Sequence, residues 1–357
     1  MSAREMLRLL AALVFVLFVM RSEAGTDPSA PTADRELVFL NWSDYVDPDL
    51  IHEFERRNTV RVRQVYYETD ERLAEMLLET NGIGFDVMIA SDTSLRAFAG
   101  FGWVEPIPEK AIPNLRHVDP RWRAGRQVEN NFGVPYLWGT VGIAYRADLL
   151  QEPITSWRQL YSPAADLHGR ILMIQDAHEV FGMALKALGR PADSNNLQDI
   201  ADAAELVRAQ APHVGAWSYV SVNEDSALVT GDAWVAMIYN GDAVTLREHH
   251  ADIRFVVPEE GSYLWVDNLA VLRATKNKAL ALRFIDFMSE PDNAARNAAY
   301  LHFATPNRSA ERLLPPEFLA DPAIYPPTAV LQRSGSVPER PAEVLRMINT
   351  VFSEVSQ

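Results

Sequence analysis

The sequence predicts an α/β protein with two lobes, each built on a mainly parallel β-sheet flanked by helices. Short apolar runs typical of buried strands alternate with helical segments of about ten residues, which is the pattern of βαβ units. The pattern occurs in both halves of the 357-residue chain, whose 48% hydrophobic and 23% charged residues are typical of a globular protein. No repeat or long Gly/Ser linker separates the halves, so we expect short strands to join the lobes as a hinge.

The first half of the chain supplies strands and helices with recognisable end signals. Asp47 and Pro48 are typical of a helix N-cap and first helical position, Thr69 is a second N-cap candidate, and Asn81-Gly82 is a helix stop. The expected elements are a strand at 37–40, a helix capped by Asp47, a strand at 60–66, a helix capped by Thr69, and a strand at 85–90.

The second half repeats the alternation. The expected elements are a strand at 141–145, a strand at 171–174, a helix at 180–188, a strand at 235–238, and a strand at 264–272 that returns to the first lobe.

Residues 1–24 are predicted to be a secretory signal. Arg4 and Arg8 precede an apolar run that is too short for a membrane span of about 20 residues, and Ser22 and Ala24 suit a signal peptidase site. An uncleaved anchor is the alternative, and residues 25–35 are expected to be a flexible tail. Because the chain has no Cys to carry a lipid, we expect an exported protein of the periplasm.

Several function classes are excluded. The absence of Cys excludes disulfide frameworks, Cys-ligated metals and thiol nucleophiles, and the net charge of −15 argues against nucleic-acid binding. No nucleotide-binding Gly motif or Gly-x-Ser-x-Gly motif is present, and Arg56 and Gly182 stand where a zinc protease needs its second His. We therefore expect no enzyme, cofactor or metal; a metal-dependent hydrolase is the least favoured alternative.

Ligands of open α/β sheets bind outside the carboxyl ends of the strands, so the residues that follow each strand are site candidates. Aromatic and acidic side chains recur there, and Lys and Arg do not. The candidates are Trp42, Ser43, Asp44, Tyr45, Ser91, Asp92, Asp176, Glu179, Tyr239 and Asp242 after strands, and Trp265 and Asp267 within the return strand. This lining suits an organic cation, because carboxylates pair with ammonium groups and rings cover methylenes.

Most of these residues also have a structural explanation when they are taken singly. The two Trp side chains suit a core, and the acids at 44, 176 and 179 suit helix caps or helix N-termini. Asp267 is harder to explain in this way, because it interrupts an apolar strand where a buried carboxylate needs a cationic partner. If Glu179 lies nearer the mouth of the site, solvent would screen its charge, and removing that charge would cost less affinity than removing the charge of Asp267.

The order of motifs resembles the periplasmic polyamine-binding proteins of spermidine/putrescine ABC transporters, over about residues 37–325. The matching segments are 41–45, Ser91, 134–139, 176–181, 239–241, 265–270 and 305–307. The resemblance implies the two-lobed periplasmic-binding-protein (type II) fold, with one lobe at 36–141 plus 267–311 and the other at 142–266 plus 312–357. It also implies a monomer that binds a polyamine and delivers it to an inner-membrane ABC permease, or that reports to a membrane signalling protein as a sensor.

The resemblance also implies roles for single residues. Asp267 would anchor an ammonium group and Asp176 with Glu179 another; Trp42, Tyr45, Tyr239 and Trp265 would wall the aliphatic chain; Ser43, Asp44 and Ser91 would hydrogen-bond an amine. The segment 42–45 is more similar to putrescine-preferring members. Thr93 and Phe303 stand where the spermidine type has Tyr, and Tyr239 stands where Trp is usual, so the choice of polyamine stays open.

Overall fold

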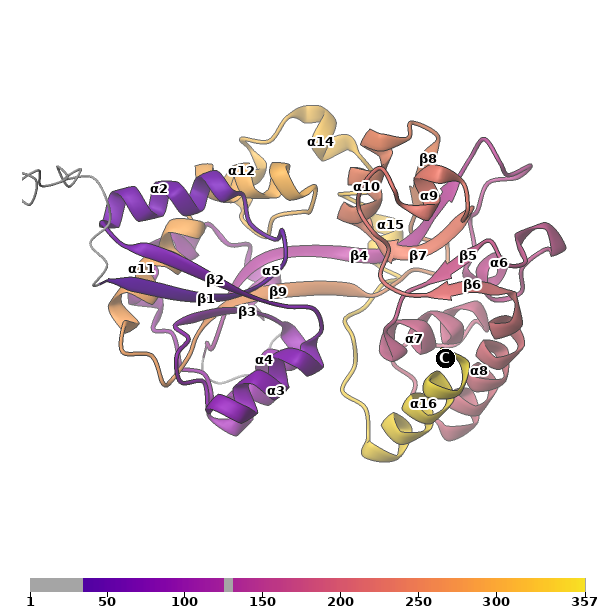
Figure 1. The fold of residues 1–357 in the computed structure, drawn as a ribbon, viewed down its shortest axis with the longest axis horizontal. Helices are drawn as coiled ribbons and strands as arrows, with labels where there is room; N and C mark the ends of the chain where they lie inside the picture. Colours follow the sequence, from indigo (N-terminus) through magenta and orange to yellow (C-terminus); the bar gives the residue numbers. More distant parts are fainter. Residues whose placement is uncertain (1–34, 125–130, 357) are drawn as a thin grey trace, which may run out of the picture.

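The computed structural model describes residues 35–124 and 131–356. The predicted signal segment and all but the last residue of the predicted tail lie outside the described residues. Figure 1 shows two lobes joined by a narrow waist. Among the described helices, none combines the length and apolarity that crossing a bilayer requires.

The described strands form one continuous sheet that runs through both lobes. In sheet order they are β2-β1-β3-β9-β4-β7-β5-β6, and β8 pairs with β4. Their bounds are β1 (Glu36–Trp42), β2 (Arg61–Tyr67), β3 (Val87–Ser91), β4 (Val134–Arg146), β5 (Ile171–Met173), β6 (Val214–Trp217), β7 (Val235–Tyr239), β8 (Ile253–Val256) and β9 (Leu264–Val271).

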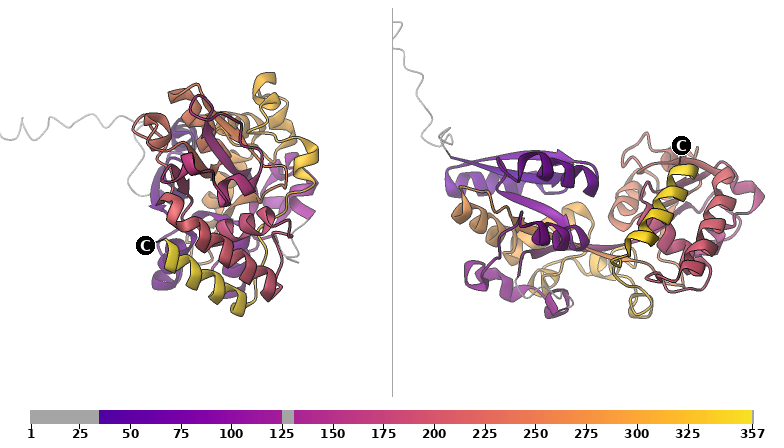
Figure 2. Two further views of the ribbon diagram at one scale, coloured as in Figure 1. Left: turned by 90° about the vertical axis from the view of Figure 1, so that its right-hand side faces the viewer. Right: turned by 90° about the horizontal axis from the view of Figure 1, so that it is seen from below.

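Strands β4 and β9 cross the waist (Figures 1 and 2). The first part of β4 pairs with β9, as far as Thr140, and from Val141 onward β4 pairs with β7 and then β8. These crossing pairs and β3–β9 are antiparallel, whereas β1 with β2 and β3, and β5 with β6 and β7, are parallel. The α/β class is confirmed, with a mixed sheet, because the crossing strands run against their neighbours.

Helices cover both lobes. They are α2 (Pro48–Asn58), α3 (Asp70–Thr80), α4 (Asp92–Phe101), α5 (Pro120–Ala124), α6 (Trp157–Tyr161), α7 (Ala177–Ala187), α8 (Leu197–Gln210), α9 (Ala227–Thr230), α10 (Asn240–His249), α11 (Lys278–Met288), α12 (Pro291–Leu301), α13 (Arg308–Glu311), α14 (Pro316–Ala320), α15 (Thr328–Leu331) and α16 (Ala342–Val355). The predicted end signals are confirmed: Asp47 caps α2, Thr69 caps α3, and Asn81 ends α3 in a left-handed conformation.

Strand β4 begins at Val134, earlier than the predicted 141. The strand includes Pro135, although proline cannot donate to a ladder. The register between β4 and β9 shifts between Pro135 and Leu137, and this irregularity accommodates the proline. The earlier start makes β4 long enough to serve both lobes.

Each lobe has its own apolar core. One core centres on Phe39, Phe54 and Phe284, and the other on Trp157 and Phe181. The sheet and helices of each lobe therefore form a packed unit, and β4 and β9 connect the two units.

Candidate functional site

Five carboxylates form what we call the acidic cluster: Asp70, Asp176, Glu179, Asp242 and Asp267. Asp70 and Asp267 both act on Tyr67, and each of the other three shares a tyrosine with one of these two, which places the five in one region. Burial is the main cause that raises the pKa of Tyr45, and the charges of Asp267 and Asp242 raise it further. Burial likewise raises the pKa of Tyr239, and the charges of Glu179, Asp176 and Asp70 add to it. The cluster draws on both lobes, because Asp70 starts α3 and Asp176 precedes α7.

Asp267 lies on β9, where it is in register with Ser91 of β3 and Leu137 of β4. The Tyr45 hydroxyl donates to Asp267 Oδ2 at 2.8 Å. Burial, followed by the Asp267 charge, raises the pKa of Tyr45 well above its ordinary value, so Tyr45 stays a neutral donor. Asp267 is partly exposed, which is less buried than its apolar strand implied.

Asp176 and Glu179 lie at the N-terminus of α7. Asp176 Oδ1 accepts from the backbone N–H of His178 at 2.8 Å and of Glu179 at 3.0 Å, so Asp176 is a helix cap. Glu179 is only 4% exposed, and its Oε2 is buried without a hydrogen-bond partner in the described part of the chain. Glu179 is more buried than Asp267 and does not meet the condition of lying nearer the mouth, because α7 is buried around most of its surface.

Burial makes the charged form of these acids unfavourable. It raises the pKa of Asp176 and of Glu179, and the Asp176 charge raises the pKa of Glu179 further. Burial alone raises the pKa of Asp242, in the first turn of α10, to about 7. Asp70, Asp176, Glu179 and Asp242 form no ion pair with a Lys or Arg among the described residues. Glu179 is buried, whereas Asp70, Asp176 and Asp242 keep part of their surface exposed; carboxylates that are desolvated in this way gain by pairing with a cation.

Four of the predicted aromatic residues form a continuous series of edge-to-face contacts. Ring centroids are 6.1 Å apart for Tyr239 and Trp265, 5.0 Å for Trp265 and Phe303, and 5.7 Å for Phe303 and Tyr45. A Cβ on Gly139 would lie 2.3 Å from the Trp265 ring, so a glycine in β4 is what lets Trp265 pack there. The series supplies an apolar wall beside the acidic cluster.

The remaining predicted residues lie differently. Trp42 packs on Tyr67, with ring centroids 4.6 Å apart, rather than in the aromatic series. Ser43 and Asp44 are exposed in the turn after β1, where Asp44 has a φ of 53°. Ser91 caps α4 by accepting from Ser94 N at 3.2 Å.

Two residues of this region were missed from the sequence. Asp70 Oδ2 accepts from Ser91 Oγ at 2.7 Å and from Ser94 Oγ at 2.6 Å. Asp70 follows the second strand closely, so the strand-end rule would have found it had the rule been applied there. Tyr219 follows β6, a strand the sequence did not reveal; its side chain is 40% exposed, and partial burial and then the Asp176 charge raise its pKa.

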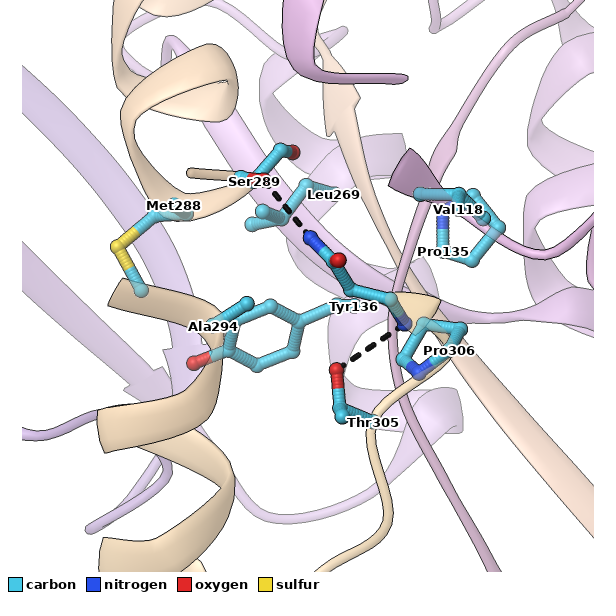
Figure 3. A pocket seen from close by; sticks show the side chains of 10 residues that line it. Val118, Pro135, Tyr136, Leu269, Met288, Ser289, Ala294, Thr305 and Pro306 are labelled. Atoms are coloured by element: carbon cyan, nitrogen blue, oxygen red, sulfur yellow. Dashed lines mark hydrogen bonds between the residues drawn. The ribbon is translucent and has the colours of Figure 1, made fainter. Parts of the chain in front are cut away.

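A small cavity lies beside Tyr136, whose hydroxyl contacts the backbone of Tyr45 (Figure 3). It has room for about one water molecule and carries no charged side chain. Its lining is Val118, Pro135, Tyr136, Leu269, Met288, Ser289, Ala294, Thr305, Pro306 and Asn307. The Tyr136 hydroxyl donates to the Tyr45 carbonyl at 2.9 Å and accepts from Asn297 Nδ2 at 2.8 Å, which fixes the backbone that carries Tyr45.

One group among the described residues has potential metal ligands close together. The ligand atoms of Asp148, His250 and Asp252 lie within 4.8 Å of one another, near the paired ends of β4 and β8. The Arg146 guanidinium donates to both Asp148 oxygens at 2.8 Å and lowers the pKa of Asp148. Asp148 is therefore already neutralised by Arg146, and the group is explained without a metal.

The family model for bacterial extracellular solute-binding proteins matches residues 49–326. The spermidine/putrescine-binding periplasmic protein of Escherichia coli K12 is 31% identical over 84% of this chain and 86% of its own length. The norspermidine sensor of Vibrio cholerae serotype O1 is 32% identical over 90% of this chain and 89% of its own. The structure of the spermidine/putrescine ABC transporter substrate-binding protein PotD from Streptococcus pneumoniae has a TM-score of 0.79 and 25% identity, covering 90% of this chain and all of that one.

Proposed function

Because the chain belongs to the bacterial extracellular solute-binding proteins, in the group of periplasmic spermidine/putrescine-binding proteins, we propose that it binds a linear polyamine between its lobes and delivers it to a membrane transporter. Like the members of its family and its relatives, which bind solutes, the protein is a periplasmic solute receptor and not an enzyme. The ligand and the membrane partner are the proposed part.

The observation that carries the proposal is the acidic cluster beside the aromatic series. A polyamine has ammonium groups separated by methylenes, and a site for it needs separated carboxylates with apolar rings between them. Asp267 with Asp242 would take one ammonium group, and Asp176 with Glu179 another. Phosphates and carboxylate ligands are disfavoured, since the cluster would repel them.

The predicted ligand residues fall into three groups under this proposal. Tyr45, Tyr239, Trp265 and Phe303 would cover the methylenes of the ligand. Trp42 would close the apolar wall on the side of Tyr67. Ser43, Asp44 and Ser91 would reach an amine end only after the lobes close, because the first two are exposed in this structure.

Closure of the lobes about β4 and β9 is part of the proposal, with boundaries near 141/142 and 266/267. Between α4 and the segment before α16, Arg96 Nε donates to Glu339 at 3.0 Å. This contact links the first lobe to the C-terminal segment that packs with the second lobe. We expect a monomer in which ligand binding reduces the scattering radius.

The experiment is a calorimetric titration of the protein without residues 1–24 against putrescine, cadaverine, spermidine, norspermidine and spermine. We expect dissociation constants at or below the micromolar range for at least one of them, and no heat with phosphate, an amino acid or a sugar. Binding of an amino acid or a sugar, without binding of any polyamine, would contradict the proposal.

Polyamine sensing is the second candidate function, and the similarity to the norspermidine sensor of Vibrio cholerae favours it. The pocket chemistry is the same for both functions, so the partner distinguishes them. Deleting the gene lowers polyamine uptake if the protein serves a permease. It leaves uptake intact and changes the output of a membrane signalling protein if the protein is a sensor.

A further inference from the structure

Asp70 is a carboxylate of the acidic cluster to which the resemblance gives no role. It begins α3, but the N-cap bond of that helix is made by Thr69, whose Oγ1 accepts from Arg72 N at 3.1 Å. Both hydroxyl donors to Asp70, from Ser91 and Ser94, bind the same oxygen, Oδ2. The other oxygen, Oδ1, is buried and accepts no hydrogen bond from any described residue.

Asp70 belongs to the first lobe and acts on groups of the second. Its charge raises the pKa of Tyr239, and the Asp176 charge raises the pKa of Asp70 in turn. Glu179, beside Asp176, is more than nine-tenths buried and also has an unpartnered oxygen, Oε2. Two buried carboxylate oxygens, one from each lobe, therefore lack a donor in the same region.

A purely structural role explains only half of this arrangement. Asp70 Oδ2 ties the start of α3 to the start of α4 through two hydroxyls, and an Asn would serve that purpose as well. Burying the second oxygen without a donor costs free energy. Burial, and then the charges of Glu71 and Asp176, work against ionisation of Asp70, while the two serine hydroxyls favour it.

We propose that Asp70 is a specificity-determining residue whose Oδ1 receives a further ammonium group, next to the one that Asp176 and Glu179 bind, so that the site selects a linear triamine over a diamine. This inference rests on the proposed function. A diamine has two ammonium groups, one bound at Asp267 and one at the pair Asp176–Glu179. Asp70, with its buried Oδ1, then has no ammonium group to compensate its charge. A triamine adds the third ammonium group that Asp70 needs.

The test compares the parent with Asp70→Asn, titrated calorimetrically with two triamines, spermidine and norspermidine, and two diamines, putrescine and cadaverine. Asn keeps an acceptor for the serine hydroxyls and removes the charge. We expect triamine affinity to fall about tenfold or more and diamine affinity by less than about threefold. Glu79→Gln is the control: it removes an exposed acid near the end of α3, away from the acidic cluster, and we expect changes within about threefold for every ligand.

Thermal unfolding of the unliganded proteins separates the two readings of Asp70. Under the proposal, Asp70→Asn melts at or above the temperature of the parent, because an unfavourable buried charge has been removed. Asp70→Ser, a smaller neutral variant, should show the same loss of triamine selectivity. A parent that prefers diamines, equal losses for both ligand classes, or two neutral variants that do not fold would each overturn the inference. If the parent binds no polyamine at all, the proposed function itself has failed.

Discussion

Replacing Asp267 with Asn tests the anchor of the proposed site. The variant keeps the size of the side chain, and the Tyr45 hydroxyl, which donates at 2.8 Å in the parent, still finds an oxygen acceptor. What disappears is the negative charge facing the ligand. The change therefore isolates the electrostatic part of recognition from shape and from the Tyr45 contact.

The expected loss follows from the environment of Asp267. A pair of unit charges about 3.5 Å apart in a medium of effective dielectric constant about 20 attracts with about 4–5 kcal/mol. Removing one partner of a buried interfacial charge pair costs about 2–5 kcal/mol. Asp267 is partly exposed, and Asp242 acts on the same Tyr45, so we expect the lower half of this range. That corresponds to a loss of about 30-fold to a few hundred-fold in affinity.

The assay is calorimetry at pH 7.5 with the polyamine that the parent binds best, after thermal unfolding has shown that the variant folds. Asp92→Asn is the control, because Asp92 already pairs with Arg96 at 2.7 Å and its charge is neutralised within the protein. We expect the control to bind within about threefold of the parent. If a folded Asp267→Asn protein also binds within about threefold, Asp267 is not the anchor.

Three further outcomes are expected. The pKa of Asp242 is about 7 in the folded protein and about 3.9 in the unfolded chain, so its protonation stabilises the unliganded parent below pH 4. This stability is lost as the pH rises to 7. Asp242→Asn should reduce that loss in thermal unfolding, and melting temperatures that fall equally with pH in parent and variant would refute the prediction. Because burial, and then the Asp176 charge, raise the pKa of Glu179, affinity should rise with pH as Glu179 releases its proton on binding the cation; titrations in buffers of different ionisation enthalpy that reveal no proton release would contradict this. Gly139→Ala should displace Trp265 and weaken binding about tenfold, while Gly100→Ala, whose Cβ meets nothing within 4 Å, should not; equal affinities would show that Trp265 does not need its present position.

Local signals in the sequence were sufficient for most of the element boundaries. Asp47, Thr69 and Asn81 act where their side chains and backbone preferences predict, because caps depend on the few neighbouring residues alone. The early start of β4 was not predictable, because the proline in it is tolerated only through a register shift against β9, which is a contact between distant parts of the chain.

The candidate site was predictable in composition but not in depth. The strand-end rule found Asp176, Glu179 and Asp242, since strand ends are set by topology, and Asp267 was found because a carboxylate interrupts the apolar strand β9. Which acid is deepest depends on how a whole helix packs: α7 buries Glu179, whereas β9 leaves Asp267 partly exposed. Asp70 was missed because the strand-end rule was not applied after β2, which ends three residues before it.

The path of the chain through β9 has a consequence for how this protein is made. The first lobe contains β1 to β3 near the start of the chain, but its sheet is completed by β9, and the bond from Tyr45 to Asp267 joins residues 222 positions apart. Until residues 264–271 have been synthesised, β3 lacks its β9 neighbour. The sheet of the first lobe can therefore be completed only after most of the second lobe has been made. Such long-range pairing slows folding. For a protein that reaches the periplasm, we expect this delay to help keep the emerging chain unfolded, and therefore able to pass through a translocation pore, until most of its length has been made.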